Sequence, residues 1–64
     1  MKHFLKITHW EWVPGSQKEM IYKDDKGKLY IGPRHDVVDE KVYVVEISDG
    51  PLEGGYRRIV KFIN

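Results

Sequence analysis

The sequence predicts an all-β fold: a small five-stranded antiparallel barrel or sandwich that forms one domain over residues 1–64. Turn-forming residues interrupt the chain at intervals of about 8–15 residues, and the pieces between them are rich in β-branched and aromatic side chains. The order of these pieces, with a long first strand, a hairpin and a connection between the third and fourth strands, favours an OB-like barrel. An SH3-like barrel is the alternative, and a single sheet that packs on itself as a dimer is the third arrangement.

The first three expected strands are separated by two turns with distinct sequence signatures. The strand over residues 2–13 ends at Pro14-Gly15, which suits a type II turn because proline presets φ and glycine accepts a positive φ. The strands over residues 19–23 and 28–31 flank Asp24-Asp25-Lys26-Gly27, a sequence typical of a type I turn followed by a left-handed glycine.

The second half of the chain predicts two further strands, residues 41–48 and 56–63, because both segments are rich in β-branched residues. The connection that precedes them carries Asp36 and, three positions later, Asp39, a spacing like that of a capping box. The two valines that follow Asp36 are poor helix formers. We therefore expect at most one short helical turn near residues 36–40.

The chain contains no cysteine, and 12% of its residues are aromatic. No disulfide can form, so a domain of this size has to gain its stability from a compact core that large aromatic side chains fill. The N-terminal segment has no apolar run long enough for a signal peptide, and no stretch approaches the roughly 20 apolar residues of a membrane span. We expect a cytoplasmic protein with no membrane partner.

The net charge of +1 hides an uneven distribution of charge along the chain. Residues 1–34 carry seven Lys and Arg against four Asp and Glu, residues 35–55 carry one Lys against six Asp and Glu, and residues 56–64 carry three Lys and Arg. A dedicated duplex-binding protein usually has a dominant basic face, so this pattern argues against one unless the basic ends fold together. The acidic segment offers electrostatic complementarity to a basic partner.

The polar residues form no recognisable catalytic or metal-binding pattern. Ser16 and Ser48 lie in or beside turns, and neither belongs to a nucleophile motif. His3, His9 and His35 do not have the spacing of zinc ligands. Adjacent carboxylates in the turns point apart, which makes them solvated turn charges rather than acid–base partners. We expect a protein that is not an enzyme and that holds no cofactor or metal.

The stretch HWEW contains both tryptophans and poses a problem of register. Leu5 and Ile7 have odd numbers whereas Trp10 and Trp12 have even numbers, so a regular strand places the two pairs on opposite faces. A bulge near Thr8-His9 would turn all four side chains toward the core. A regular strand would instead leave the tryptophans outside, as an aromatic patch of the kind that marks interaction sites. Because a small domain needs its large aromatics inside, we expect at least one tryptophan in the core.

Protein binding is the function that this composition favours most. Trp, Tyr and Arg are the residues enriched at binding hot spots, and small β domains dock on partners through a face or an edge strand. The expected module acts as an adaptor or a stoichiometric inhibitor of a larger protein, and a homodimer through the edge of the last strand stays open. The candidate partner-binding residues are Trp10, Trp12, Lys6, Tyr56, Arg57 and Arg58.

Single-stranded nucleic acid is the alternative ligand. Its binding needs aromatic side chains that stack on bases and Lys or Arg side chains that follow the phosphates. In OB-like barrels, the second and third strands form the usual binding face. The acidic residues of the 24–25 turn and of the 36–53 segment argue against this function. The candidate nucleic-acid-binding residues are Tyr22, Lys23, Lys28, Tyr30 and Arg34.

Overall fold

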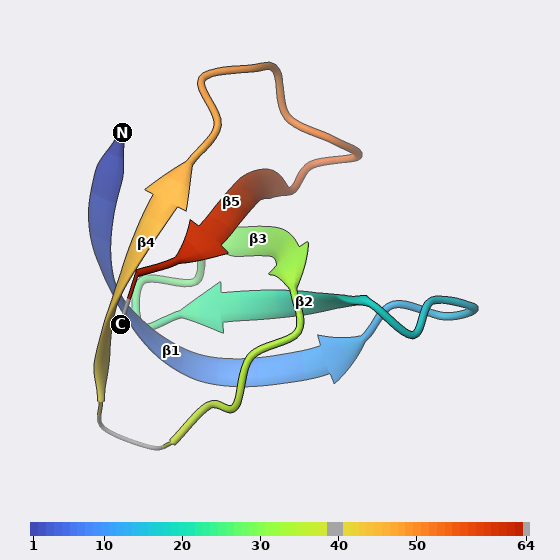
Figure 1. Ribbon diagram of the computed structural model, residues 1–64, viewed down its shortest axis with the longest axis horizontal. Coiled ribbons are helices and arrows are strands. Elements are labelled where there is room, and N and C mark those ends of the chain that lie inside the picture. Colours follow the sequence, from blue (N-terminus) through green and yellow to red (C-terminus); the bar gives the residue numbers. More distant parts are fainter. Residues whose placement is uncertain (39–40, 64) are drawn as a thin grey trace.

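The computed structural model describes residues 1–38 and 41–63, and these residues form five strands and no helix (Figure 1). The predicted strands are all present, and their ends agree with the prediction to within two residues. The helical turn predicted near residues 36–40 is absent from residues 36–38, whereas Asp39 and Glu40 lie outside the described residues. The strands are β1 (Lys2–Trp12), β2 (Glu19–Asp24), β3 (Leu29–Pro33), β4 (Val42–Ile47) and β5 (Arg57–Phe62).

The five strands close into a barrel in the order β1-β2-β3-β5-β4, which confirms the predicted fold class. Four of the strand pairs are antiparallel, but β3 and β5 run parallel, which the sequence did not predict. The insertion of β5 between β3 and β4 gives the Greek-key order of the favoured OB-like barrel. Strand β5 lies between β3 and β4 rather than at an edge of the barrel, although its ladder with β3 extends only over Arg57 and Arg58. The homodimer left open through the edge of this strand stays an untested possibility.

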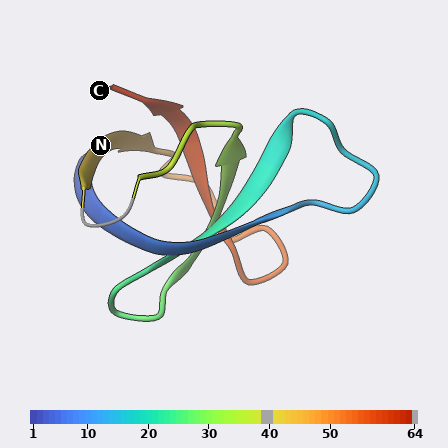
Figure 2. The ribbon, with the colours of Figure 1, turned by 90° about the horizontal axis from the view of Figure 1, so that it is seen from below.

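Strand β1 is long and changes its neighbour halfway along its length (Figures 1 and 2). Its first half, Lys2 to Lys6, pairs with β4, and its second half, Ile7 to Trp12, pairs with β2. The register with β2 shifts between Ile7 and His9, so Thr8 is the extra residue of a β-bulge. Of the two arrangements that the sequence leaves open for this strand, the structure has the one with a bulge near Thr8-His9. The shift lets the strand bend from one side of the barrel to the other.

The predicted turns have the backbone conformations that their sequences require. Gly15 has a φ of 79° and Gly27 a φ of 82°, both in the left-handed region that glycine accepts without strain. The turn between β2 and β3 is further held by Asp24, whose carboxylate is buried. Its Oδ1 accepts hydrogen bonds from the N–H groups of Lys26 (2.9 Å) and Lys28 (2.8 Å). Hydrogen bonds between residues close in sequence therefore hold this hairpin turn.

The core fills the barrel with alternate residues of the strands, and one end of the barrel is closed by the connection between β3 and β4. The ring of His35 stacks on Phe62 with 4.1 Å between centroids, and the Tyr43 hydroxyl accepts a hydrogen bond from the Val38 N–H (2.6 Å). The buried apolar residues are Leu5, Ile7, Met20, Tyr22, Tyr30, Tyr43, Val45, Ile47 and Ile59.

Among the described residues, no helix is long and apolar enough to cross a membrane.

Candidate functional site

Both tryptophans lie on the inner face of the β1–β2 ribbon and yet remain half exposed. Trp10 pairs with the buried Tyr22, and Trp12 pairs with the buried Met20, so all four side chains share one face. The exposed fractions of Trp10 and Trp12 are nevertheless 49% and 44%. The ribbon extends beyond the point where β4 leaves β1, and no strand of the described chain covers its inner face there. The expectation of a tryptophan in the core is wrong, although the bulge on which it depended is present.

The two indole rings and Arg34 form a continuous surface, which we call the tryptophan surface. The rings meet edge to face with 6.3 Å between their centroids. The guanidinium carbon of Arg34 lies 5.0 Å from the centroid of the Trp12 ring, at cation–π distance. A concavity of about 160 Å³ lies beside these residues, lined also by Met20 and residues 35–37. Arg34 is one of the predicted nucleic-acid-binding residues. Its contact with Trp12 could not be predicted from the sequence, because the closed barrel is needed to bring β1 and the end of β3 together.

The loop between β1 and β2 fixes the outer end of the tryptophan surface. The Ser16 hydroxyl accepts hydrogen bonds from the N–H groups of Lys18 (3.2 Å) and Glu19 (3.1 Å). The carbonyl of Lys18 in turn accepts a hydrogen bond from the Arg34 N–H (3.1 Å). The backbone of Arg34 is therefore held against the loop while its side chain covers Trp12.

The structure does not bring the remaining predicted partner-binding residues to the tryptophan surface. Arg57 pairs with Tyr30 and lines a separate concavity beside Leu52. Lys6 is exposed opposite Val42, on the half of β1 that faces β4. The tryptophans lie on the other half of β1, so the predicted six-residue set does not form one surface.

Arg58 has a structural role that the sequence did not indicate. Its guanidinium donates two hydrogen bonds to the Glu53 carboxylate (2.9 and 2.7 Å) and a further one to the Glu19 carboxylate. The hydrogen bond from Arg58 holds the pKa of Glu53 below its ordinary value. The backbone of Tyr56 pairs with that of Glu53 in the same loop. Arg58 thus ties the loop between β4 and β5 to the barrel wall, and its charge is already neutralised.

Tyr22 and Tyr30 are unavailable for base stacking, because both rings are buried in the core. The hydroxyl of Tyr22 donates to the carbonyl of Pro33 (2.6 Å), and that of Tyr30 donates to Oδ2 of Asp24 (3.0 Å). Burial raises the pKa of each hydroxyl to about 12. The predicted stacking role of both tyrosines is therefore wrong: the pairing register turns them inward.

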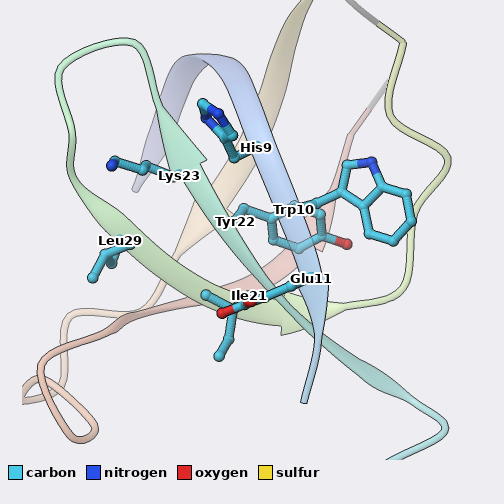
Figure 3. A pocket seen from close by; sticks show the side chains of 7 residues that line it. All are labelled: His9, Trp10, Glu11, Ile21, Tyr22, Lys23 and Leu29. Carbon is cyan, nitrogen blue, oxygen red and sulfur yellow. The ribbon is translucent and has the colours of Figure 1, made fainter. Parts of the chain in front are cut away.

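The outer face of β1, β2 and β3 carries a second concavity of about 350 Å³ (Figure 3). Lys23 and Leu29 lie on this side of the sheet, whereas the rings of Trp10 and Tyr22 point to the opposite side. Lys23 and Lys28, two of the predicted nucleic-acid residues, are exposed. This face thus offers cationic and aliphatic groups, and the large aromatic rings belong to the other face. The remaining lining residues are His9, Glu11 and Ile21.

Neither the arrangement of metal-ligating side chains nor comparison with known proteins assigns a function to the tryptophan surface. No group of three or more His, Cys, Asp or Glu side chains in residues 1–38 and 41–63 is placed to hold a metal ion. Comparison of the chain with protein families, curated proteins and solved structures gives no match. The tryptophan surface is therefore interpreted from its own geometry.

Proposed function

We propose that this domain is a protein-interaction module that docks on its partner through the tryptophan surface. The supporting observation is the exposure of two neighbouring indole rings. The domain has no disulfide, and a chain of this size buries only a small hydrophobic core, so each large apolar side chain left in water is a notable loss of stability. A tryptophan side chain can bury about 150–250 Å². Leaving half of that area in water forgoes on the order of 2–3 kcal/mol per ring at about 25 cal/mol per Å². A partner that covers the rings recovers this free energy.

The geometry of the tryptophan surface suits a binding hot spot. Tryptophan and arginine are the residue types most enriched at such sites, where they supply large contact areas with few rotatable bonds. The edge-to-face contact of the two rings and the position of Arg34 over Trp12 order these side chains before binding. Less conformational entropy is then lost when a partner docks.

The distribution of charge supports a partner with acidic groups beside its apolar contact. In the described chain, Glu19 and Glu53 are engaged by Arg58, and Glu46 lies 3.3 Å from the N-terminal amine. Lys18 and Arg34 lie side by side at the edge of the tryptophan surface. In the acidic segment, from which complementarity to a basic partner is predicted, Glu46 and Glu53 are already paired, whereas Asp36 and Asp49 stay exposed. An adaptor or a stoichiometric inhibitor in the cytoplasm fits these properties.

The test is capture of partners from the native host by the wild-type domain and by a Trp12→Ala variant. We expect loss of specific partners with Trp12→Ala, because truncation removes the ring that Arg34 covers. Leu52→Ala is the matched control, since Leu52 is an apolar side chain with a similar exposed fraction, 56%, and lies in the loop between β4 and β5. Thermal unfolding would show that both variants fold. Equal recovery of the same partners by Trp12→Ala and wild type would refute the proposal.

Single-stranded nucleic acid is a second candidate, favoured by the OB-like strand order and by the exposed rings beside Arg34. Trp10 and Trp12 would replace the buried tyrosines as stacking groups, with Arg34 and Lys18 at the edge of the tryptophan surface toward the phosphates. Titration with mixed-sequence single-stranded DNA and RNA should then quench the indole fluorescence, and the effect should weaken steeply as salt is raised. An unchanged emission at low salt would exclude this candidate.

A further inference from the structure

The backbone groups of Trp10 and Trp12 point away from β2. The Val13 N–H donates to the Glu19 carbonyl (3.4 Å), so these two residues form a hydrogen-bonded pair of the β1–β2 ladder. In an antiparallel ladder, hydrogen-bonded pairs alternate with non-hydrogen-bonded ones. Trp12 and Trp10 lie one and three positions before Val13, so both belong to non-hydrogen-bonded pairs. Their N–H and C=O groups therefore point to the other edge of β1.

The pairing of β2 with β3 agrees with this assignment. The Asp24 N–H donates to the Lys28 carbonyl (3.0 Å), and alternation along β2 then gives β3 the backbone groups of the even-numbered residues of β2. The odd-numbered residues of β2 are left for β1, and beyond the bulge they lie opposite odd-numbered residues of β1. The even-numbered Trp10 and Trp12 thus have no backbone partner in β2.

The outward edge of β1 is short, and in the described part of the chain no strand pairs with it beyond Lys6. Strand β4 pairs with the residues from Lys2 to Lys6 and stops there. Figure 2 shows the second half of β1 running along the near side of the molecule. The bulge at Thr8, whose hydroxyl donates to a carbonyl of β2 (3.4 Å), limits the edge at one end, and Pro14, which has no N–H, limits it at the other. The edge therefore presents the backbone donors and acceptors of the two tryptophans.

We propose that this edge binds an extended segment of a partner protein, which adds to the sheet as an antiparallel strand beside Trp10 and Trp12. The inference rests on the proposed function, because it names the kind of partner that the tryptophan surface takes. Unpaired N–H and C=O groups along a strand are a template for another strand, and antiparallel pairing is the more stable of the two directions. Two hydrogen-bonded pairs, one at each tryptophan, hold the segment.

The side chains along the edge specify the sequence of the added strand. The residues opposite Trp10 and Trp12 lie on the inner face, beside the indole rings and the concavity of about 160 Å³, so they should be apolar. The residue between them lies opposite Glu11 on the outer face, where a lysine or arginine is favourable. The chain's own β1 does not have this pattern, because a second copy in the same position would set Glu11 against Glu11. The edge thus fits a different protein.

Charge complementarity specifies one further position of the added strand. The guanidinium carbon of Arg34 lies 5.0 Å from the centroid of the Trp12 ring, and among the ion pairs of the described residues none includes Arg34. A stacked guanidinium can donate two parallel hydrogen bonds to a carboxylate. Lys18, whose carbonyl accepts the Arg34 N–H, adds a second positive charge at this end. The residue of the added strand that lies next beyond Trp12 on the inner face should therefore be acidic.

The first experiment is a titration of the isotope-labelled domain with a synthetic peptide, followed by NMR. The probe is the acetylated and amidated peptide Glu-Thr-Val-Lys-Val-Thr, which has the acidic, apolar, cationic and apolar residues at the positions described above. A strand of this length buries less than a standard interface of about 1,600 Å², so we expect a dissociation constant of roughly 0.1–1 mM.

Backbone amide exchange distinguishes an added strand from contact with the rings alone. Near saturation, exchange at the Trp10 and Trp12 amides should slow by about tenfold, because it then proceeds from the free domain, whereas exchange at His9 and Glu11, which face β2, should not change. Indole signals that shift while the Trp10 and Trp12 amides stay unprotected would overturn strand addition, and so would the absence of any change at saturating peptide. Protection that rises with the concentration of the domain alone would assign the edge to a second copy and also overturn the proposal.

The second experiment tests the register by exchanging charges. Glu11→Lys places two cations opposite each other and should weaken binding of the probe peptide by about five- to tenfold. A peptide with glutamate in place of its lysine should bind Glu11→Lys with the affinity of the original pair and should bind the wild-type domain more weakly. Failure of the exchanged pair to recover the affinity would contradict the register.

The third experiment tests the acidic position of the added strand. Arg34→Ala should weaken binding of the probe peptide by about two- to fivefold, the effect of an exposed ion pair. A peptide with glutamine in place of its glutamate should bind the wild-type domain and Arg34→Ala equally. Arg57→Ala, which removes the same charge at an exposed position beside β3, is the matched control. An equal loss in the control would show a general effect of charge and contradict the role of Arg34.

The outcomes for the added strand and for the proposed function can be told apart. Loss of captured partners with Trp12→Ala, together with unprotected Trp10 and Trp12 amides, would leave the interaction module standing and overturn strand addition. Protection of both amides by the probe peptide, while Trp12→Ala retains every captured partner, would support strand addition and refute the proposed role of the tryptophan surface.

Discussion

Asp24 is expected to be the polar residue on which the stability of this domain depends most. Asp24 as a whole is 5% exposed. Oδ1 accepts the N–H groups of Lys26 (2.9 Å) and Lys28 (2.8 Å), and Oδ2 accepts the hydroxyl of the buried Tyr30 (3.0 Å). One carboxylate thus joins the tip of the β2–β3 hairpin to the core. The perturbation of interest is Asp24→Ala, with Asp24→Asn as the milder variant.

The expected loss in the free energy of unfolding follows from what happens to the three hydrogen-bond donors that lose the Asp24 carboxylate as their acceptor. The Tyr30 hydroxyl stays buried without an acceptor, which costs about 1–3 kcal/mol, whereas the two N–H groups regain water and lose about 0.5–1.5 kcal/mol each. The total for Asp24→Ala is about 2–6 kcal/mol, centred near 4 kcal/mol. Stabilities of roughly 0.05–0.15 kcal/mol per residue give this chain of 64 residues roughly 3–10 kcal/mol in all. The variant should therefore be at or near the limit of folding, and Asp24→Asn should lose about 1–2 kcal/mol.

The assay is urea unfolding followed by circular dichroism, with Asp25→Ala as the control. Asp25 is the exposed neighbour of Asp24 in the same turn, so its truncation should change the free energy of unfolding by no more than about 0.5 kcal/mol. If Asp24→Ala and Asp25→Ala unfold at the same urea concentration with the same slope, the role assigned to the buried carboxylate is wrong.

The same carboxylate makes stability depend on pH. Burial alone would raise the pKa of Asp24, but the hydrogen bonds from Lys28, Tyr30 and Lys26 outweigh it, so the pKa lies below its ordinary value. A pKa lowered in the folded state contributes stability that is present above the unfolded value of about 3.9 and is lost as pH falls through the folded value. Wild-type stability should therefore fall below about pH 5 more steeply than that of Asp24→Asn.

Three further results are expected. Gly32→Ala should cost about 1–3 kcal/mol by urea unfolding, because overpacking is expensive and a Cβ there would lie 2.7 Å from the Cβ of Ile59; unchanged stability would show that β5 can move. Burial raises the pKa of Tyr22 and Tyr30 to about 12, so an alkaline absorbance titration should show two tyrosines that ionise at higher pH than ordinary tyrosines. The neutral hydroxyls contribute stability that is fully present below about pH 10, and this contribution should be lost as pH rises toward 12. Arg58→Ala should accelerate amide exchange in the loop between β4 and β5, and exchange like that of wild type would remove its proposed role.

The strands could be predicted because their limits are set by local chemistry. Pro14-Gly15 and the sequence from Asp24 to Gly27 specify turns through backbone preferences that act over four residues, and both turns form as expected. The parallel contact of β3 with β5 could not be predicted in the same way. It joins Tyr30 to Arg57, far apart in sequence, and no local preference records it.

The candidate site was predicted less well, because side-chain exposure depends on how the barrel closes. Strand β2 has apolar residues on both faces, Met20 and Tyr22 on one and Ile21 on the other, so its pattern fits either orientation. Pairing with β1 and β3 turns Tyr22 inward and Ile21 outward. The role of Arg58 was missed for a similar reason, since its partner Glu19 is distant in sequence and becomes a neighbour through the barrel wall.

The bulge at Thr8 links the exposed tryptophans to the free edge of β1. Without the shift, the alternation that buries Leu5 and Ile7 would carry His9 and Glu11 inward, which would place polar groups where Trp10 and Trp12 now face. The shift resolves this conflict, but β4 has already left β1 at Lys6, so the indole rings face inward where the barrel has no further wall. In the described part of the chain, the same departure of β4 leaves Trp10 and Trp12 with β2 as their neighbour on one side and no paired strand on the other. A partner that docks on the tryptophan surface, as proposed above, would cover the indole rings at the place where no strand of the described chain covers them.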